Sequence, residues 1–392
     1  MAMTSTAPVT TTWSQVAKLR LVRQHLLERA PREQMVEVVR AMVGLQTQVT
    51  SAAELQLVAR VDGLRPDDIR DALASERSLV KTWAMRGTLH WLAADDLASF
   101  IAAYPTRDGT AAPAWVKAFG VTPGQLTAVV DEIGAVLTDR PMTRGELADA
   151  VEHAAADPAA ASRLRSAWGE ILKPAAGRGK LAFGPDRGRN VTFVSPDAWL
   201  GRPVAAARDL DSGRALGAFG GLMGRWLRVF PGAGRDAVAR WWGVARKPRV
   251  TEAVAADGLD LVDLDIEGTK GWVRRDDRAA LEAAKPVPHV RLLPMFDPWV
   301  NELPRQVDQL LPTERHDAVH RTAGWVSAVV LVDGRIGGMW EIESGKGGAG
   351  TVVVEPFYRW RGGAARELAA EVDRIAAYLD RPLSTSIGPP SR

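Results

Sequence analysis

The feature that most constrains the fold of this chain is a repeated pattern of three helices followed by two short strands, clearest between residues 122 and 195. Thr122 is a favourable N-cap residue and Pro123 a favourable first helical residue, so an amphipathic helix is predicted to begin there. Thr143 and Glu146 have the spacing of a capping box, which predicts the start of a second, shorter helix.

A third helix is predicted over residues 162–175, ending near Gly177. Two short apolar runs, LAF and VTFV, follow it, and the loop GPDRGRN between them predicts a hairpin. Three helices and a two-stranded wing are typical of the winged helix-turn-helix, in which the third helix enters a groove of DNA and the wing contacts the backbone.

The same order of elements is predicted on both sides of this segment. The preceding copy has a hairpin from LVKTWAM into GTLHWLA after helices expected at residues 14–28, 32–43, 51–61 and 66–75. The following copy has the strands LDLVDLDI and GWVRRD after helices expected at residues 212–228, 234–242 and 247–256. We interpret the pattern as three winged-helix units, although copies this divergent are also compatible with helical segments that are not true repeats.

The pattern changes after residue 288. Apolar alternation on both sides of Asp333 and Gly334 predicts a hairpin, GTVVVEPF predicts a further strand, and a closing helix is expected over residues 363–379. A chain of 392 residues is long enough for several domains. The predicted organisation is a disordered tail, three winged-helix units and a C-terminal β domain, at residues 1–12, 13–105, 106–200, 201–288 and 289–392.

The composition excludes several classes of protein. Hydrophobic residues make up 46% and charged residues 25% of the chain, as in an ordinary folded protein. Cysteine is absent, which excludes disulfides, iron–sulfur clusters, thiol nucleophiles and zinc sites with cysteine ligands. Of the 50 basic residues only nine are lysine. The arginine excess suits phosphate binding, but a GC-rich genome would produce it as well.

A short bridge between two predicted helices holds the most informative pair of side chains. Gly44 is a suitable residue to end the first helix, and Ser51 with Glu54 predicts a capping box for the second. In an extended bridge, residues two apart face the same side, so Gln46 and Gln48 would be directed together. Two amides on one side could hold a water between a carbonyl acceptor and an NH₂ donor. The alternative is that both glutamines only satisfy backbone groups.

Five motifs, in the same order along nearly the whole chain, resemble those of a known family: GLQTQ at 44–48, WAMRGTLHWL at 83–92, GRGKLAFGP at 177–185, LLPMFDPWV at 292–300 and VLVDGRIGGMW at 330–340. The family is that of the AlkZ and YcaQ winged-helix DNA glycosylases, which unhook interstrand crosslinks. The resemblance implies an α+β fold of three tandem winged helix-turn-helix units and a C-terminal small β-barrel, which together form a concave DNA-binding surface.

The resemblance also implies the catalytic residues. The motif of the family is glutamine, a middle residue, and then glutamine or aspartate, which maps onto Gln46 and Gln48. The azinomycin-resistance type carries glutamine at both ends, as this chain does, and the broader YcaQ branch ends in aspartate. The middle residue is usually aliphatic, whereas this chain has Thr47, a difference that affects the packing of the loop more than its chemistry.

A pair of glutamines restricts the possible chemistry. An amide neither gives nor takes a proton at ordinary pH, so the pair cannot protonate a leaving base, and that base must already carry positive charge, as guanine alkylated at N7 does. No lysine amine is placed to form a Schiff base, so we expect a monofunctional glycosylase that leaves an abasic site. The expected partner is double-stranded DNA with a bulky alkylated or crosslinked guanine, in base-excision repair or in self-resistance to a genotoxin.

Further residues are expected to contact DNA from the first two predicted hairpins: Arg86, Thr88, His90, Arg178, Lys180, Arg187 and Arg189. His90 alternates with Trp91, so one would face the core and the other DNA, unless His90 is an ordinary structural residue. The basic residues of the second hairpin could also serve solubility alone. Asp297 and Asn301 could line the site from the β domain, although an aspartate before Pro298 is equally typical of a turn.

Two other motifs are interpreted without function. The glycines of SGKGGAGT imitate a phosphate-binding loop, but a β run and not a helix follows them, so a hairpin tip is expected. His316 and His320 have the spacing of zinc ligands, but the glutamate of the metalloprotease pattern and a third ligand are missing. We therefore expect neither a metal site nor a cofactor.

The alternative function is a non-enzymatic winged-helix regulator that grips DNA with the same wings. A regulator has no need of paired glutamines in a bridge, which favours the enzyme. The N-terminus lacks a basic segment followed by an apolar one, and no run reaches the ~20 apolar residues of a membrane span. A monomeric, cytoplasmic and nucleoid-associated protein is expected.

Overall fold

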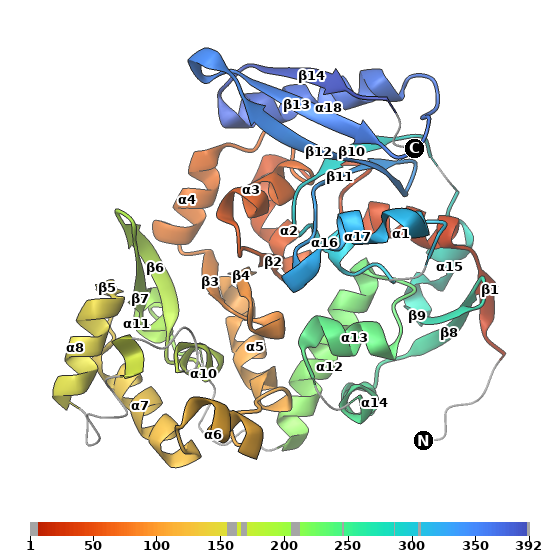
Figure 1. Ribbon diagram of the computed structural model, residues 1–392. Helices are drawn as coiled ribbons and strands as arrows, with labels where there is room; N and C mark the ends of the chain where they lie inside the picture. Colours follow the sequence, from red (N-terminus) through yellow and green to blue (C-terminus); the bar gives the residue numbers. More distant parts are fainter. Residues whose placement is uncertain are drawn as a thin grey trace. The chain divides into compact units, whose positions relative to one another are not determined.

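The computed structural model has an α+β fold (Figure 1), and it describes residues 7–154, 163–165, 171–204, 212–244, 247–285, 287–304 and 307–389. The chain forms two compact units. Unit 1 comprises Met1–Ile69, Gly224–Val238 and Leu259–Arg392, and unit 2 comprises Arg70–Met223 and Ala239–Gly258. Across the described residues, no helix combines the length and the apolar character needed to cross a membrane.

Two helices in unit 2 begin where the sequence predicts. The side chain of Thr122 caps α7 (Pro123–Val136), and Pro123 is its first residue. Strand β5 (Met142–Thr143) precedes α8 (Arg144–Ala154), and the predicted capping box is present at its start. The Glu146 N–H donates to Thr143 Oγ1 at 3.4 Å, and the Thr143 N–H donates to Glu146 Oε2 at 2.7 Å. Both predicted helix starts are confirmed.

The predicted third helix of this segment lies partly outside the described residues, and Arg163–Arg165 within it form a short 3-10 turn. Its described end is α10 (Leu172–Gly177), which stops at the expected residue. The two predicted strands are confirmed as an antiparallel hairpin of β6 (Ala182–Arg187) and β7 (Asn190–Val194). The turn is tighter than GPDRGRN suggests, because β6 continues to Arg187 and Gly188 reverses the chain with a φ of +65°.

A core cluster joins these elements. On α7 the buried residues Leu126, Val129, Val130 and Ile133 have the spacing of one helix face. They pack with Phe193 of β7 and with buried side chains of α8 and α10. The antiparallel strands of unit 2 run in the order β4 (Leu89–Ala93), β3 (Leu79–Trp83), β6, β7, β5, and the predicted β3–β4 hairpin is confirmed.

Six further helices up to residue 258 lie near predicted positions: α2 (Met35–Ala41), α3 (Thr50–Val58), α4 (Pro66–Ala74), α12 (Ser212–Val229), α13 (Arg235–Trp242) and α14 (Pro248–Asp257). The structure adds three helices that the sequence pattern did not predict: α5 (Leu97–Ala103), α6 (Pro113–Phe119) and α11 (Pro196–Leu200). The hairpin after α14 is also confirmed, as β8 (Leu261–Ile266) and β9 (Thr269–Arg274).

The N-terminal part of unit 1 corrects two predictions. Residues 1–12 were expected to be a disordered tail; residues 1–6 lie outside the described chain, but β1 (Val9–Thr11) pairs in parallel with β8, with Val9 opposite Leu264. Helix α1 (Trp13–Arg23) ends earlier than the predicted residue 28. The reason is local, because His25 takes a left-handed φ of +56° and its N–H bonds back to Val22 O.

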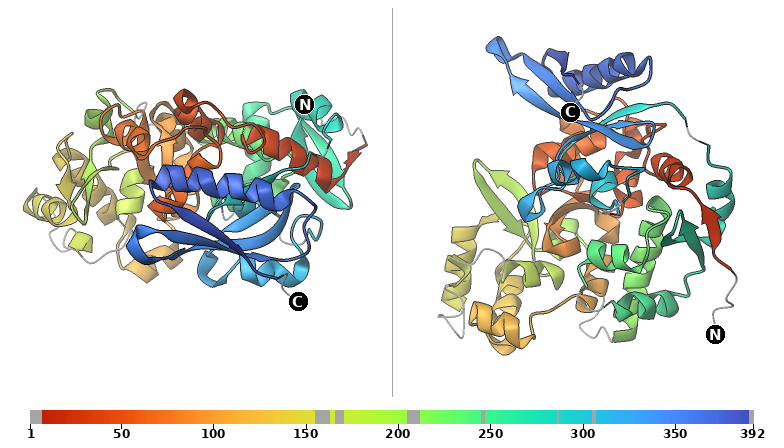
Figure 2. Two further views of the ribbon diagram at one scale, coloured as in Figure 1. Left: turned by 90° about the horizontal axis from the view of Figure 1, so that it is seen from above. Right: turned by 45° about the vertical axis from the view of Figure 1, so that its right-hand side comes forward.

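A five-stranded sheet fills the C-terminal part of unit 1, in the order β10 (Val290–Leu293), β11 (Val329–Val332), β12 (Arg335–Ser344), β13 (Gly350–Pro356), β14 (Leu383–Ile387). Asp333 and Gly334 both have positive φ, as a two-residue hairpin turn requires, so the predicted hairpin is confirmed. The segment SGKGGAGT connects β12 to β13, as expected of a hairpin tip. The predicted closing helix is α18 (Ala364–Leu379), which packs against β10 and β14 along one face of the sheet (Figure 2).

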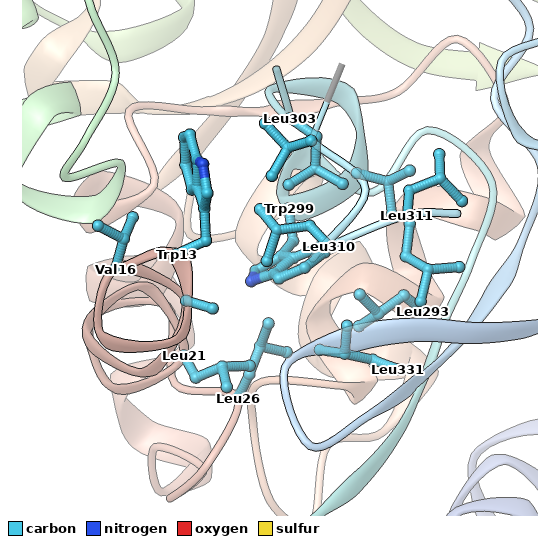
Figure 3. Close-up of a cluster of buried hydrophobic side chains, with 14 of the residues drawn as sticks. Trp13, Val16, Leu21, Leu26, Leu293, Trp299, Leu303, Leu310, Leu311 and Leu331 are labelled. Atoms are coloured by element: carbon cyan, nitrogen blue, oxygen red, sulfur yellow. The ribbon is translucent and has the colours of Figure 1, made fainter. Parts of the chain in front are cut away.

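A hydrophobic cluster of unit 1 lies between α1, the sheet and the segment that follows β10. Short helices in that region are α15 (Arg278–Glu282), α16 (Pro298–Asn301) and α17 (His316–Val319). Trp299 of α16 is fully buried among leucines that include Leu26, Leu303 and Leu310 (Figure 3). Burial of a side chain this large anchors a helix of only four residues.

Arg60 and Asp297 form a fully buried ion pair in unit 1. Arg60 lies just after α3, and its Nη1 and Nη2 donate to the two carboxylate oxygens of Asp297 at 2.7 and 2.8 Å. Asp297 is also the N-cap of α16 and accepts from the Trp299 N–H at 2.9 Å. The pair therefore fixes α16 relative to α3.

Replacing Asp297 by asparagine should destabilise unit 1 by about 3 to 5 kcal/mol, because the charge of Arg60 would remain buried without a counter-charge while the cap of α16 is kept. Urea unfolding measures the loss. Asp62→Asn is the control, since Asp62 pairs with Arg374 at an exposed position and should contribute at most ~1 kcal/mol. Equal losses for the two variants would contradict a special role for the buried pair.

Candidate active site

The glutamine loop starts from a strained helix end. At the end of α2 the Val43 N–H donates to Arg40 O and the Gly44 N–H donates to Val39 O, both at 3.0 Å. These two hydrogen bonds are the pair that defines a Schellman motif. Gly44 follows the helix as predicted, but Val43 occupies the first left-handed position, with a φ of +56°. A β-branched residue rarely adopts that conformation, and Val43 is held in it by complete burial.

Side chains alternate along the loop after Gly44. Gln46 ends the short strand β2 (Leu45–Gln46) and is half-buried, Thr47 is 1% exposed, and Gln48 is exposed. This order is the one expected of an extended segment, in which both glutamines lie on the side opposite the buried threonine. The threonine in the middle position is thus accommodated as a core residue.

The capping box predicted for the next helix is wrong. Helix α3 begins at Thr50, its N-cap is Val49, and no side chain caps it. Val49 packs against the hydrophobic cluster of unit 1, so packing and not capping sets the helix start. Glu54 lies beside Tyr378 of α18, where burial raises the pKa of its carboxyl.

Two amides from elsewhere in unit 1 hold the loop. Asn301, the last residue of α16, donates from Nδ2 to Gln46 Oε1 at 3.0 Å. Gln56 of α3 is 0% exposed, and its Nε2 lies 3.4 Å from both Gln46 O and Phe296 O. The structure therefore brings the predicted residues Gln46 and Asn301 together, and it adds Gln56 to them.

Asp297 has a supporting position. Its carboxylate is occupied by Arg60 and by the Trp299 N–H, so it acts on the site through α16 and not by direct contact with the glutamines. Arg60 also donates to Gln56 O at 2.9 Å. Sequence reasoning missed Gln56 and Arg60, although two polar residues four apart in the apolar segment LQLVARV are a signal of buried polar contacts.

The first hairpin of unit 2 corrects the prediction for His90. Both His90 and Trp91 are buried, at 2% and 1% exposed, so neither of the two faces solvent. The Nδ1 of His90 bonds to Thr88 O at 2.9 Å, and because a carbonyl only accepts, this nitrogen carries the proton. Arg86 is exposed at the turn, and Thr88 donates from Oγ1 to Met85 O.

The basic residues of the second hairpin occupy two kinds of position. Arg178 is half-buried and lies within 3.5 Å of Asp108, Thr110 and Thr127. Arg187 and Arg189 are exposed at the tip, and Arg187 donates to Glu146 at 2.8 Å. The hydrogen bond from the Thr143 N–H, followed by those from Arg187 and from the Thr143 hydroxyl, lowers the pKa of Glu146 to about 2. Lys180 is half-buried, with its aliphatic chain over Gly134.

Burial, followed by the nearby charge of Arg86, lowers the pKa of His90 from 6.5 to about 3. Between these values the unfolded chain binds a proton that the folded protein does not, so the free energy of unfolding should fall as the pH drops from 6.5 towards 3, by up to ~1.4 kcal/mol per pH unit. His90→Gln should remove that part of the slope. Urea unfolding at pH 7, 5 and 4 measures it, and parallel pH profiles for the two proteins would contradict the prediction.

Comparison with known proteins places this arrangement in a family. The family model for AlkZ-like DNA glycosylases matches residues 39–378. An interstrand DNA cross-link repair glycosylase of Streptomyces sahachiroi is 33% identical over 350 residues, which cover 88% of this chain and 90% of the relative. The solved structure of the Streptomyces sahachiroi DNA glycosylase AlkZ matches with a TM-score of 0.86 and 30% identity, over 97% of this chain and 100% of that one. The chain therefore belongs to the AlkZ-like DNA glycosylase family and is an enzyme that hydrolyses N-glycosyl bonds.

Proposed function

We propose that this enzyme excises cationic N7-alkylpurines from double-stranded DNA, with bulky or crosslinked N7-alkylguanine as its main substrate and an abasic site as its product. Gln46 and Gln48 are the catalytic residues, the enzyme acts as a monomer, and neither metal nor cofactor takes part. The name of the Streptomyces sahachiroi relative, an interstrand DNA cross-link repair glycosylase, supports the crosslink part of the proposal. The resemblance to the azinomycin-resistance type suggests self-resistance to a genotoxin.

The hydrogen bond from Asn301 to Gln46 is the observation that carries the proposal. At 3.0 Å it fixes the orientation of the Gln46 amide, and Gln56 fixes the backbone of the same residue. A carbonyl oxygen has two lone pairs, so Gln46 Oε1 can accept from a water while Asn301 holds it. An amide that only satisfied a loose backbone group would not need a second amide to orient it.

The two amides need only orient a water and stabilise positive charge, without transferring a proton. A water oriented by Gln46 and Gln48 bonds to C1′ of the sugar as the C1′–N9 bond breaks, and the electron pair of that bond neutralises the cationic purine, which leaves without protonation. The water loses its proton to solvent. The amide oxygens stabilise the positive charge that develops on the sugar, and that of Gln46 is held by Asn301 before the reaction.

DNA contacts are proposed for the two hairpins of unit 2. We infer that each hairpin is the wing of a winged-helix unit, that β8 and β9 form a third wing, and that the C-terminal sheet is the small β-barrel of the family. Arg187 and Arg189 are exposed at a hairpin tip and suit phosphate contacts. Arg86, Thr88, Arg178 and Lys180 would contact DNA beside them, while the buried His90 supports its hairpin from inside. A cytoplasmic, nucleoid-associated location follows from DNA as the partner.

Replacing Gln46 or Gln48 by alanine should lower single-turnover release of N7-alkylguanine by about 10- to 1000-fold, or roughly 1.4 to 4 kcal/mol of transition-state stabilisation, with duplex binding near normal. Gln48→Asp should retain activity on simple alkylpurines, because a carboxylate also stabilises the positive sugar. Base release is measured on DNA with a defined N7-alkylguanine, with alkaline cleavage to reveal abasic sites. Undiminished release by both alanine variants would leave the glutamines a structural role, and no release by the parent would remove the proposed substrate.

Asn301 is expected to act through Gln46 as a positioning residue. Asn301→Ala should slow release by about 3- to 10-fold, the value of one hydrogen bond, and Asn301→Asp should slow it as much, because it keeps the size of the side chain but cannot donate. Combined with Gln46→Ala, the Asn301→Ala change should have no further effect. Full additivity of the two changes would show that Asn301 acts independently of Gln46.

A further inference from the structure

A pocket of about 740 Å³ in unit 1 has no part in the chemistry proposed so far. It is bounded by the first turns of α3, by α17 and the segment that follows it, and by β12 and β13, which Figure 1 labels. The volume exceeds what one purine needs and falls in the range of ~300 to 1,000 Å³ typical of pockets for drug-sized ligands.

The pocket begins close to the glutamine loop. Ser51 lines it and follows Gln48 by three residues, a stretch that spans at most ~11 Å. Met295 also lines the pocket. The carbonyl of the next residue, Phe296, accepts from Gln56 Nε2, and so does the carbonyl of Gln46. The same two segments, α3 and residues 294–297, thus support both the loop and the pocket.

The lining combines apolar surface with negative charge. Leu55, Met339, Ile342 and Val353 are among its apolar side chains. Three carboxylates and one guanidinium complete the charged part: Asp317, Glu341, Glu355 and Arg321. A phosphodiester would be repelled by the carboxylates, whereas an apolar group that carries a positive charge would be attracted.

We propose that this pocket binds the substituent of a bulky N7-alkylguanine, an aromatic or aliphatic group of drug size that carries a protonated amine. The inference rests on the proposed function and specifies which part of the lesion the pocket holds. A duplex without such a substituent offers it only phosphates and bases, and the methyl group of N7-methylguanine is too small to fill it. The pocket therefore selects for the adduct while the glutamines act on the bond common to all N7-alkylguanines.

Strand register supplies matched pairs of variants. Glu341 of β12 lies opposite Val353 of β13, and two residues further along the same face Glu343 lies opposite Thr351. Glu341 and Val353 line the pocket, and the second pair lies beyond its lining. Tryptophan is tolerated on such strand positions, so Val353→Trp fills the pocket while Thr351→Trp adds the same bulk next to it.

The test compares single-turnover base release from two duplexes at subsaturating protein, one with N7-methylguanine and one with an N7-alkylguanine whose arm carries an aromatic ring and an amine. Val353→Trp should slow release of the bulky base by about 10- to 200-fold, with release of N7-methylguanine changed less than about two-fold, and Thr351→Trp should leave both rates unchanged. Glu341→Lys should also disfavour the bulky cationic base alone, with Glu343→Lys as its control.

Equal effects of Val353→Trp on both bases would overturn the proposal, whether the rates are retained or lost. If that variant does not fold, Glu341→Lys tests the proposal instead. An unchanged ratio between release of the bulky base and release of N7-methylguanine would then be incompatible with a pocket for the cationic arm. This ratio does not depend on which residues orient the water. If the parent releases neither base, the proposed function fails, and the affinity of the parent and of Val353→Trp for the bulky duplex relative to unmodified duplex still tests the pocket.

Discussion

The geometry of the glutamine site depends on the buried ion pair between Arg60 and Asp297. Two charges removed from water are tolerated only when each stays paired and hydrogen-bonded, so neither residue can move without a large loss of free energy. Arg60 lies just after α3, and Asp297 caps α16. The pair therefore sets the position of Asn301 relative to the loop that α3 follows. Trp299 lies between Asp297 and Asn301 in the sequence, and its buried side chain makes α16 part of the hydrophobic core.

Two residues in segments that support this loop have strained backbone conformations. Val43 precedes it with a φ of +56°, and Phe296 precedes Asp297 with a φ of +59°. Such conformations cost about 1 to 3 kcal/mol each and persist only when the surroundings determine them. Both side chains are buried, and Gln56 lies within 3.4 Å of the carbonyls of Phe296 and Gln46. A rigid, strained support is consistent with amides that must be oriented before the substrate arrives.

Local signals predicted much of the fold because helix caps and hairpin turns depend on neighbouring residues. The Thr122, Thr143 and Asp333 signals all correspond to observed elements. Predictions failed where distant packing decided the outcome: β1 exists because β8 offers it a parallel partner, and α3 starts at Thr50 because Val49 packs into the core. β14, with the polar sequence LSTSI, was missed because its strand character comes from pairing with β13.

For the site, the sequence by itself determined the two glutamines, their extended spacing and the absence of a titrating group between them, since these follow from residue identity and local geometry. Only the tertiary structure decided which residues hold Gln46. Asn301 reaches Gln46 across 255 positions of the chain, and Arg60 reaches Asp297 across 237. The tertiary structure also buried both His90 and Trp91, although the alternating strand pattern predicted that one of the two would be exposed. Burial and long-range pairing depend on what the rest of the chain packs against a residue, which no local pattern contains.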